Sequence, residues 1–130
     1  YGYGPYESYS DKHRASWVDR FDTTVDDMFE DYVFPQENGS HYNCQYASVG
    51  NLYAKGKKAF SFQASRYSEK ELDEKAHNFE LVPSDGISVA LDYKQSGIGS
   101  NSCGPRLAEK YQLREEKIEW EISIRFDNGN

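Results

Sequence analysis

The chain has 130 residues, enough for one domain or part of one. Its 15 basic and 22 acidic residues give a net charge of −7, which excludes the broad basic face that nucleic-acid binding requires. No stretch approaches the roughly 18 apolar residues of a membrane helix, so the sequence predicts a soluble chain that binds neither nucleic acid nor membrane.

The first third of the chain predicts little regular structure. Residues 1–42 are polar, and glycines and prolines punctuate them with turn signals. An irregular region of this length is uncommon in a compact domain, so we expect it to pack against something else. Within it, the glycosylation sequon at residues 38–40 is interpreted as an ordinary glycine-containing turn.

Strand patterns begin after this region. Residues 43–54 predict a strand that is interrupted at Gly50-Asn51. Residues 58–65 alternate apolar and polar side chains with a period of two, which predicts a second, half-buried strand with its phenylalanines on the core face.

A short helix is predicted near residues 68–77. Ser68 can cap the first free amides, and Glu71, three residues later, is placed to reach back in a capping box. Leu72 and Ala76 would give this helix one thin apolar edge.

Three further strands complete the pattern. Residues 79–82 and 87–93 are predicted as strands separated by a Pro-Ser-Asp-Gly turn, and a loop rich in Gly and Ser follows at 95–105. The last strand is the clearest signal, because its alternating apolar face must be covered by another sheet. That face consists of Ile118, Trp120, Ile122, Ile124 and Phe126.

Together these elements predict an all-β fold, an antiparallel β-sandwich with one short helix. No repeat or linker divides the chain. We therefore expect a single region, 1–130, that is irregular over 1–42 and built of strands over 43–130.

Acidic residues crowd the beginning of the chain. Glycoside hydrolysis needs two carboxylates that face one sugar, but the spacing here selects no such pair. We interpret these residues as a solvated acidic face. They are Glu7, Asp11, Asp19, Asp22, Asp26, Asp27, Glu30, Asp31 and Glu37.

The histidines and cysteines show no catalytic or metal-binding spacing. His13, His41 and His77 lie in polar stretches and are predicted to be surface residues. Cys44 and Cys103 are too few for a disulfide scaffold, so we expect free thiols and a cytoplasmic location. The residues alone assign no catalytic residue and no metal site.

Four segments, spread in order over the whole chain, resemble the end of the large β-galactosidases of glycoside hydrolase family 2. They follow the family patterns G-x-G-P-x-E-x-Y-x-D, D-M…Y-V-x-P-x-E-N-G, F-x-F-x-x-S-x-Y-S-x-x-x-L and G-[IV]-G…S-W-x-P. The matching segments are residues 1–11, 27–39, 60–72 and 97–105.

The resemblance implies a place and a role for the chain. It would be the C-terminal half of a large sandwich of the galactose-mutarotase type, in a bacterial enzyme that hydrolyses terminal β-D-galactosides such as lactose. The family's catalytic glutamates and its Mg²⁺ and Na⁺ or K⁺ sites lie elsewhere. The fragment alone is therefore expected to be inactive and to hold no cofactor, with the rest of the β-galactosidase chain, or its large subunit, as partner.

The resemblance also singles out the loop 97–105. In enterobacterial members a Trp on this loop stacks against the acceptor sugar. Cys103 stands at that position here, and the loop is one residue shorter, so the resemblance implies weaker binding of glucose as acceptor. Asn101 and Ser102 remain able to hydrogen-bond a sugar hydroxyl or a neighbouring loop. The alternative is that this loop only closes a Gly-rich turn. These three residues are the candidate substrate-binding residues.

Two other functions stay open. The aromatic fraction of 15% is compatible with a free-standing carbohydrate-binding module, which would place two or three rings on one exposed face. Trp120 and Phe126 instead share an alternating, core-like face. The chain could also serve as an assembly fragment. In isolation it is expected to self-associate as a homo-oligomer through exposed apolar residues such as Phe29, Tyr32 and Phe34.

Overall fold

The computed structural model describes residues 1–99 and 104–127. It is mainly β, with antiparallel pairing throughout and almost no helix, as predicted. The strands are β1 (Gly2–Gly4), β2 (Trp17–Asp19), β3 (His41–Val49), β4 (Leu52–Ser65), β5 (Ser88–Asp92) and β6 (Ile122–Phe126). The helical segments are α1 (Glu69–Glu74) and three single 3₁₀ turns, η1 (Asp26–Met28), η2 (Asn78–Glu80) and η3 (Glu109–Tyr111).

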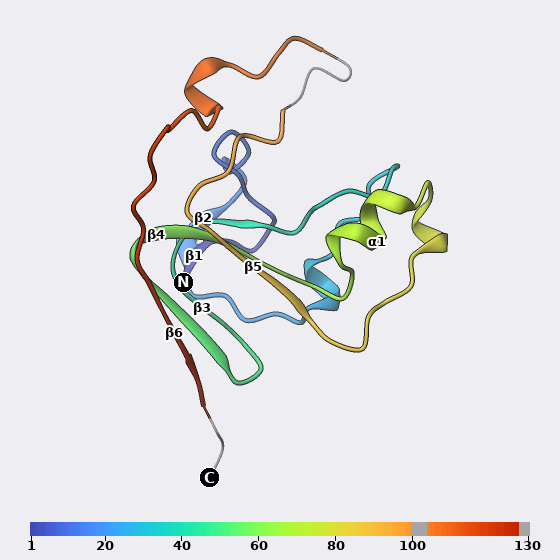
Figure 1. Ribbon diagram of the computed structural model, residues 1–130, viewed down its shortest axis with the longest axis horizontal. Coiled ribbons are helices and arrows are strands. Elements are labelled where there is room, and N and C mark those ends of the chain that lie inside the picture. The colour runs from blue at the N-terminus through green and yellow to red at the C-terminus, as the bar shows by residue number, and fades with distance from the viewer. Residues whose placement is uncertain (100–103, 128–130) are drawn as a thin grey trace.

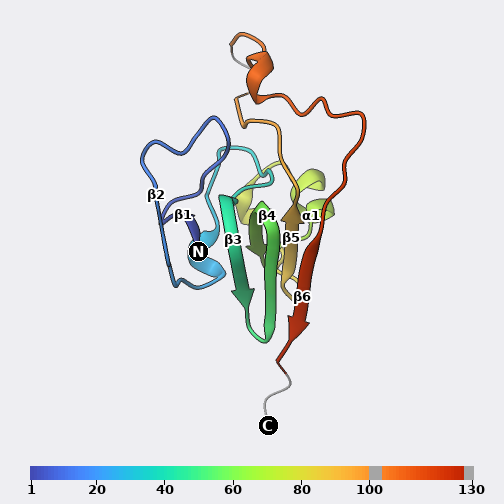
Figure 2. The same ribbon diagram turned by 90° about the vertical axis from the view of Figure 1, so that its left-hand side faces the viewer.

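Strand β4 is the centre of a four-stranded sheet. It pairs with β3 along one edge, while its other edge pairs first with β6 and then with β5 (Figure 2). The predicted interruption at Gly50-Asn51 is confirmed, but it separates two antiparallel strands: these residues form the turn of the β3–β4 hairpin, and Gly50 adopts a φ of +56° there. The two strands predicted over 43–54 and 58–65 are in fact a hairpin whose second arm runs on to Ser65.

A bulge lets β4 continue through its lysine-rich middle. The register with β3 shifts between the pairs Cys44–Phe60 and Tyr46–Lys55, so extra residues of β4 face a short part of β3. The backbone is tight at this point, because a Cβ on Gly56 would lie 2.1 Å from the carbonyl oxygen of Lys58. The bulge is also where the neighbour of β4 changes from β6 to β5.

The core lies on one face of this sheet, around Phe60, which is 2% exposed. Residues 58–65 were predicted to form a strand that is buried on its phenylalanine face only. Ser61 and Gln63, on the opposite face, are buried as well. Gln63 contacts the N-terminal region, because its side chain donates a hydrogen bond to the backbone carbonyl of Asn38, and Ser61 lies beside residues 93–95 and 110–113. The core consists of Met28, Cys44, Ala47, Ala54, Phe60, Phe62 and Ala64.

Residues 1–40 contain β1, β2 and η1 (Figure 1), and β1 and β2 lie on the β3 side of the sheet (Figure 2). The backbone of Tyr1 exchanges hydrogen bonds with Gln45 and Tyr46, which extends pairing beyond the outer edge of β3. The sequon is buried in irregular chain: Asn38 is 4% exposed, and Gly39 has a φ of +71°.

The helix begins as predicted but ends early. The Ser68 hydroxyl accepts a hydrogen bond from the Glu71 amide at 3.1 Å, which makes Ser68 the N-cap. The predicted capping box is only half formed, because the Glu71 carboxylate accepts from the amide of Val82 instead. Helix α1 ends at Glu74, and Ala76, expected on its apolar edge, lies exposed beyond it.

The strand predicted at 79–82 is wrong. Its place is taken by the turn η2, where the Glu80 carboxylate accepts hydrogen bonds from the amides of Ala76 and His77. This local capping satisfies backbone groups that a strand would have to pair with a neighbour, and it leaves Phe79 86% exposed. The strand predicted at 87–93 is confirmed as β5.

The last strand is shorter than predicted, and its apolar face is mostly uncovered. Only Ile122–Phe126 pairs with β4, and of the five apolar residues just Trp120 and Ile122 pack against the core. Ile118, Ile124 and Phe126 are 47%, 50% and 60% exposed. Across the residues that the structure describes, no helix has the length and apolar character needed to cross a bilayer.

Candidate functional site

A single buried carboxylate organises the N-terminal region. Glu7 is 5% exposed, and both of its oxygens accept hydrogen bonds. Oε1 accepts from the Lys12 ammonium and the Tyr32 hydroxyl, while Oε2 accepts from the Tyr9 hydroxyl at 3.1 Å and the Gly39 amide at 2.9 Å. With four donors around it the carboxylate is well satisfied, which suits a structural role.

The charge of Glu7 is stabilised where it lies. Burial alone raises the pKa of Glu7, but the hydrogen bonds from Lys12, Tyr32 and Gly39 outweigh it, so the pKa falls below its ordinary value. Burial and the neighbouring Glu7 charge raise the pKa of the Tyr9 phenol. The anion and its phenol donors are therefore fixed in the protonation states that these hydrogen bonds require.

Beside Glu7 the chain makes a tight turn that ends in a second bound carboxylate. Tyr9 and Lys12 exchange backbone hydrogen bonds of 2.8 and 3.1 Å, which closes the turn and places Asp11 at its tip. There the two oxygens of Asp11 accept from successive amides, Ile98 at 2.9 Å and Gly99 at 3.0 Å. Asp11 thus holds the beginning of the loop 97–105.

Other contacts fix the same stretch of chain, which we call the loop foot (residues 96–99). The Gly97 amide donates to the carbonyl of Tyr111 at 2.9 Å, and the Leu113 amide donates to the Ser96 hydroxyl at 3.0 Å. Gly97 is required by space, because a Cβ there would lie 2.4 Å from the Asp11 carboxyl group. The candidate residues Asn101, Ser102 and Cys103 lie outside the described residues.

The four sequence segments that define the resemblance meet around these carboxylates. Segment 1–11 supplies Glu7 and Asp11. Segment 27–39 supplies donors to Glu7, and segment 97–105 supplies the amides that bind Asp11. The remaining segment, 60–72, supplies Gln63, which donates to the backbone of segment 27–39. The residue spacing within any one segment does not predict these contacts between segments. The only signal in the sequence was that all four segments occur together in one chain.

The expectation of a solvated acidic face is therefore wrong for two of its members. Glu7 is buried, and Asp11 is half-buried and bound to the loop foot. The other seven are exposed, as interpreted. Among residues 1–99 and 104–127, no group of three or more His, Cys, Asp or Glu side chains is arranged to hold a metal ion.

All three histidines were expected at the surface, but two of them, His13 and His41, are half-buried. The His41 ring lies within 3.0 Å of the carbonyl oxygen of Tyr3, and burial lowers its pKa. His13 packs against the rings of Tyr3 and Tyr42, which also stack on each other. His77 is exposed, as predicted. Cys44 is a free thiol in the core, and burial raises its pKa to about 11, which disfavours the reactive thiolate.

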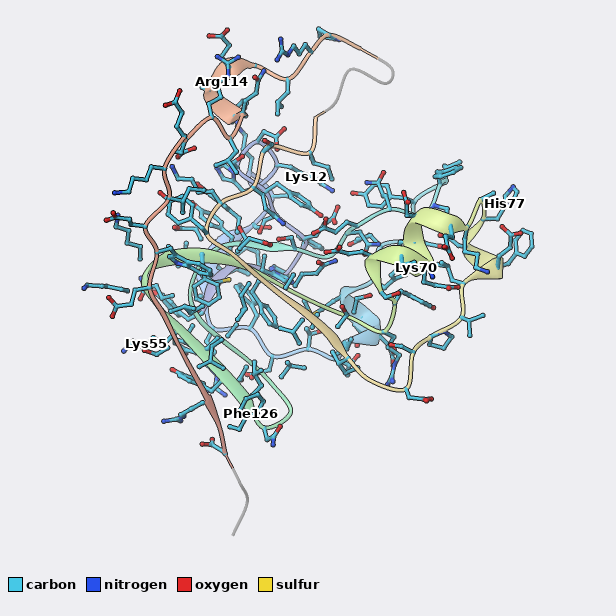
Figure 3. All side chains as sticks on the ribbon, viewed as in Figure 1. Lys12, Lys55, Lys70, His77, Arg114 and Phe126 are labelled. Carbon is cyan, nitrogen blue, oxygen red and sulfur yellow. The ribbon has the colours of Figure 1, made fainter. Side chains whose placement is uncertain are left out.

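Two hollows flank the site. One of about 560 Å³ opens beside the 9–12 turn and is lined by charged residues that include Lys12, Arg14 and Glu30. Lys12, labelled in Figure 3, lines this hollow and donates to Glu7. The other hollow, of about 370 Å³, lies between β4 and residues 110–113.

Comparison with known proteins places this arrangement in a family. The family described as "Beta galactosidase small chain" matches residues 1–126. A protein named Beta-galactosidase from Actinobacillus pleuropneumoniae is 49% identical over 127 residues, which is 98% of this chain and 12% of the relative. Proteins of the same name from Staphylococcus xylosus and Pseudoalteromonas haloplanktis are 42% and 32% identical, over 97% and 95% of this chain and 13% and 12% of their own lengths. The chain thus corresponds to a small piece of these relatives, and it belongs to the β-galactosidase small chain family.

Proposed function

We propose that this chain is the C-terminal, non-catalytic part of a family 2 β-galactosidase that hydrolyses terminal β-D-galactosides such as lactose. It completes the last β-sandwich of the parent enzyme as the C-terminal half of a larger, galactose-mutarotase-like domain. It also contributes the loop 97–105 to the acceptor side of the active site.

The observation that carries the proposal is a family match along 126 residues, with relatives that are about eight times longer. The surface of the chain also supports packing against a larger body. Large apolar side chains are exposed on several separate segments, among them Val33, Phe79, Val82 and Phe126. We assign the partner surface to the rest of the parent chain or to its large subunit.

The loop foot supports the second half of the proposal. A loop that only closed a turn would need no carboxylate to bind two of its amides, yet Asp11 does so from 87 positions away in sequence. Such anchoring suits a loop that must hold Asn101, Ser102 and Cys103 at a fixed place in the parent enzyme.

No catalytic residue, metal or other cofactor is assigned to this chain. In the proposal, the acid/base and nucleophile glutamates and the Mg²⁺ and Na⁺ or K⁺ ions belong to the rest of the parent enzyme. The parent is a cytoplasmic bacterial hydrolase of carbohydrate metabolism. The isolated chain is inactive.

Truncation and complementation test the proposal. The parent enzyme is shortened to end before Tyr1 and assayed on a chromogenic β-galactoside with and without this chain. We expect the truncated enzyme to be inactive and added chain to restore turnover. A truncated enzyme with full activity would refute the assigned role.

A second candidate function, carbohydrate binding by the chain itself, is favoured by one observation. The 370 Å³ hollow is lined by three half-buried rings, Tyr42, Tyr93 and Tyr111, together with amide side chains. Rings and amides are the groups on which sugars stack and hydrogen-bond. The exposed rings elsewhere come from different segments and include Trp17, which packs edge-on against Phe21.

Titration with lactose or galactose separates the two functions. Trp120 lies 6.4 Å from the ring of Tyr93, so its fluorescence reports on this hollow. A saturable change that is lost in Tyr93→Ala would support a binding module. No change up to high sugar concentration would leave the accessory role as the better account.

A further inference from the structure

We propose that Asp11 is a positioning residue for the acceptor loop. Its carboxylate fixes the backbone of the loop foot at Ile98 and Gly99, and it thereby tunes how well the parent enzyme accepts glucose in place of water. This inference rests on the proposed acceptor role of the loop 97–105.

The first step is the geometry of the contact. Each oxygen of Asp11 binds one amide, and the two amides are consecutive in the chain, at 2.9 and 3.0 Å. Hydrogen bonds to an ionised carboxylate are roughly twice as strong as neutral ones. Two such bonds to neighbouring peptide groups fix the orientation of the backbone as well as its position.

The second step is that Asp11 is itself held rigidly. It stands at the tip of a turn that is closed by backbone hydrogen bonds between Tyr9 and Lys12. Both of these residues also donate from their side chains to the buried Glu7. The loop foot is therefore tied, through one short turn, to the most buried carboxylate described in the chain.

The third step is that the contact tolerates neither a larger residue at position 97 nor an amide at position 11. A Cβ on Gly97 would lie 2.4 Å from the carboxyl carbon of Asp11, so no larger residue fits without displacing the carboxylate. Asparagine in place of Asp11 offers one acceptor and one NH₂ group. Whichever way it is turned, its NH₂ faces an amide N–H, and one hydrogen bond is lost.

The experiment uses the full-length parent enzyme with a nitrophenyl β-galactoside as donor and D-glucose as acceptor. The ratio of transfer product to free galactose gives the glucose concentration for half-maximal transfer. We expect Asp11→Asn and Gly97→Ala each to raise this concentration about tenfold, the effect of losing one hydrogen bond to a charged group. Turnover measured without glucose in the same variants normalises the glucose response.

Matched controls separate positioning from general damage. Asp85→Asn makes the same chemical change in an exposed turn, and Gly86→Ala adds a methyl group where no atom lies within 4 Å. Neither should change the response to glucose. In the double variant Asp11→Asn/Gly97→Ala, the effects should be less than additive, because the two changes disturb one contact.

A readout independent of catalysis tests the contact itself. Hydrogen exchange of the segment 96–99 in the parent enzyme should be faster in Asp11→Asn than in the wild-type enzyme or in Asp85→Asn. If exchange and glucose response are both unchanged in a folded Asp11→Asn enzyme, the inference is overturned. It is also overturned if turnover without glucose falls in parallel with the glucose response.

The failure of the proposed function is recognised separately. Substitution of Asn101 and Ser102 by alanine tests the acceptor role of the loop in the same assay. If these substitutions alter the glucose response and Asp11→Asn does not, only the positioning role is wrong. If neither changes it while exchange at 96–99 rises in Asp11→Asn, Asp11 anchors the loop but the loop has no acceptor role, and both claims about acceptance are overturned.

Discussion

The Glu7 carboxylate illustrates how a charge is kept inside a small β domain. Removing an ion from water is costly, and the structure offsets this cost with four donors, of which only Lys12 is charged. The Lys12 side chain is half exposed, so its ammonium group keeps part of its hydration while it neutralises Glu7. The donors come from residues as far as 32 positions away, so the carboxylate also joins separate segments.

Replacing Glu7 by glutamine should destabilise the fold. A carboxamide has one NH₂ group, and in either orientation it would face a group that can only donate, the Lys12 ammonium or the Gly39 amide. We expect a loss of about 1–3 kcal/mol in the free energy of unfolding, the cost of one unsatisfied buried donor. Urea unfolding followed by tryptophan fluorescence measures it. Glu119→Gln, an equal change on an exposed side chain, should cost less than about 0.5 kcal/mol; equal losses in both variants would contradict the prediction.

The same carboxylate should make stability depend on pH in the acid range. Its pKa is lower in the folded chain than the ordinary value of 4.5, because hydrogen bonds to Lys12, Tyr32 and Gly39 outweigh its burial. The unfolded chain therefore takes up the proton first. The contribution of Glu7 is complete above pH 4.5 and is lost as the pH falls through the folded-state pKa. Midpoints of urea unfolding between pH 5 and pH 3 should fall more steeply in the wild type than in Glu7→Gln.

His41 should act in the same direction in a higher pH window. Burial lowers its pKa below the ordinary 6.5, against the raising effect of the Tyr3 carbonyl. Stability is therefore complete above pH 6.5 and declines as the pH falls below it, because the unfolded chain binds the proton more readily. His41→Gln should abolish this decline between pH 7 and pH 5, whereas the exposed His77→Gln should leave it in place. An unchanged pH profile in His41→Gln would assign the decline to another group.

At the scale of elements, the bulge in β4 decides the topology of the sheet. It allows one strand to present two successive stretches to two different neighbours, β6 and β5, while β3 follows its other edge. The bend brings the carbonyl oxygen of Lys58 against the Cα of Gly56, with the Phe60 ring close behind. Glycine is required here by close approach rather than by an unusual φ angle.

Gly56→Ala should therefore destabilise the sheet. The added Cβ would lie 2.1 Å from the Lys58 oxygen and 2.9 Å from the Phe60 ring, so the backbone must move at the edge of the core. We expect a loss of about 1–3 kcal/mol in urea unfolding, as for other overpacked sites. Gly86→Ala, in an open turn, should be neutral or stabilising by up to about 1 kcal/mol. A neutral Gly56→Ala would mean that the bulge relaxes freely.

Local patterns predicted the elements whose cause is local. The Ser68 cap and strand β5 follow from side chains within a few residues, and the sequence located both. The strand expected at 79–82 failed because Glu80 captures nearby amides, a competition that apolar periodicity does not record. The candidate site was out of reach for a different reason. Asp11 and Ile98 are 87 positions apart, and no pattern within either segment indicates the other.

At the scale of the whole molecule, the sheet is covered at its β3 side and has unpaired strand edges at its other side. The N-terminal region covers the β3 side, whereas the outer edges of β5 and β6 pair with no strand among the described residues. The expected apolar cluster at 29–34 is only partly exposed, because Phe29 packs edge-on against Tyr67 and the Tyr32 hydroxyl binds Glu7. The open surface lies instead at β6, where Phe126 projects at the end of the molecule far from Lys12 (Figure 3).

This open face should make the isolated chain self-associate. Ile122, Ile124 and Phe126 share one face of β6, and exposure grows along the strand because the core ends near Ile122. An edge strand with an uncovered apolar face pairs readily with a second copy. Light scattering after size exclusion should give a mass above that of the monomer, and Phe126→Lys should shift it toward the monomer. Ser123→Lys adds the same charge on the opposite face of β6 and should not.

If both lysine variants dissociate the chain equally, charge along the strand edge governs association rather than the apolar face. If the wild-type chain is monomeric at high concentration, β6 needs no cover, and the partner surface assigned to it belongs elsewhere.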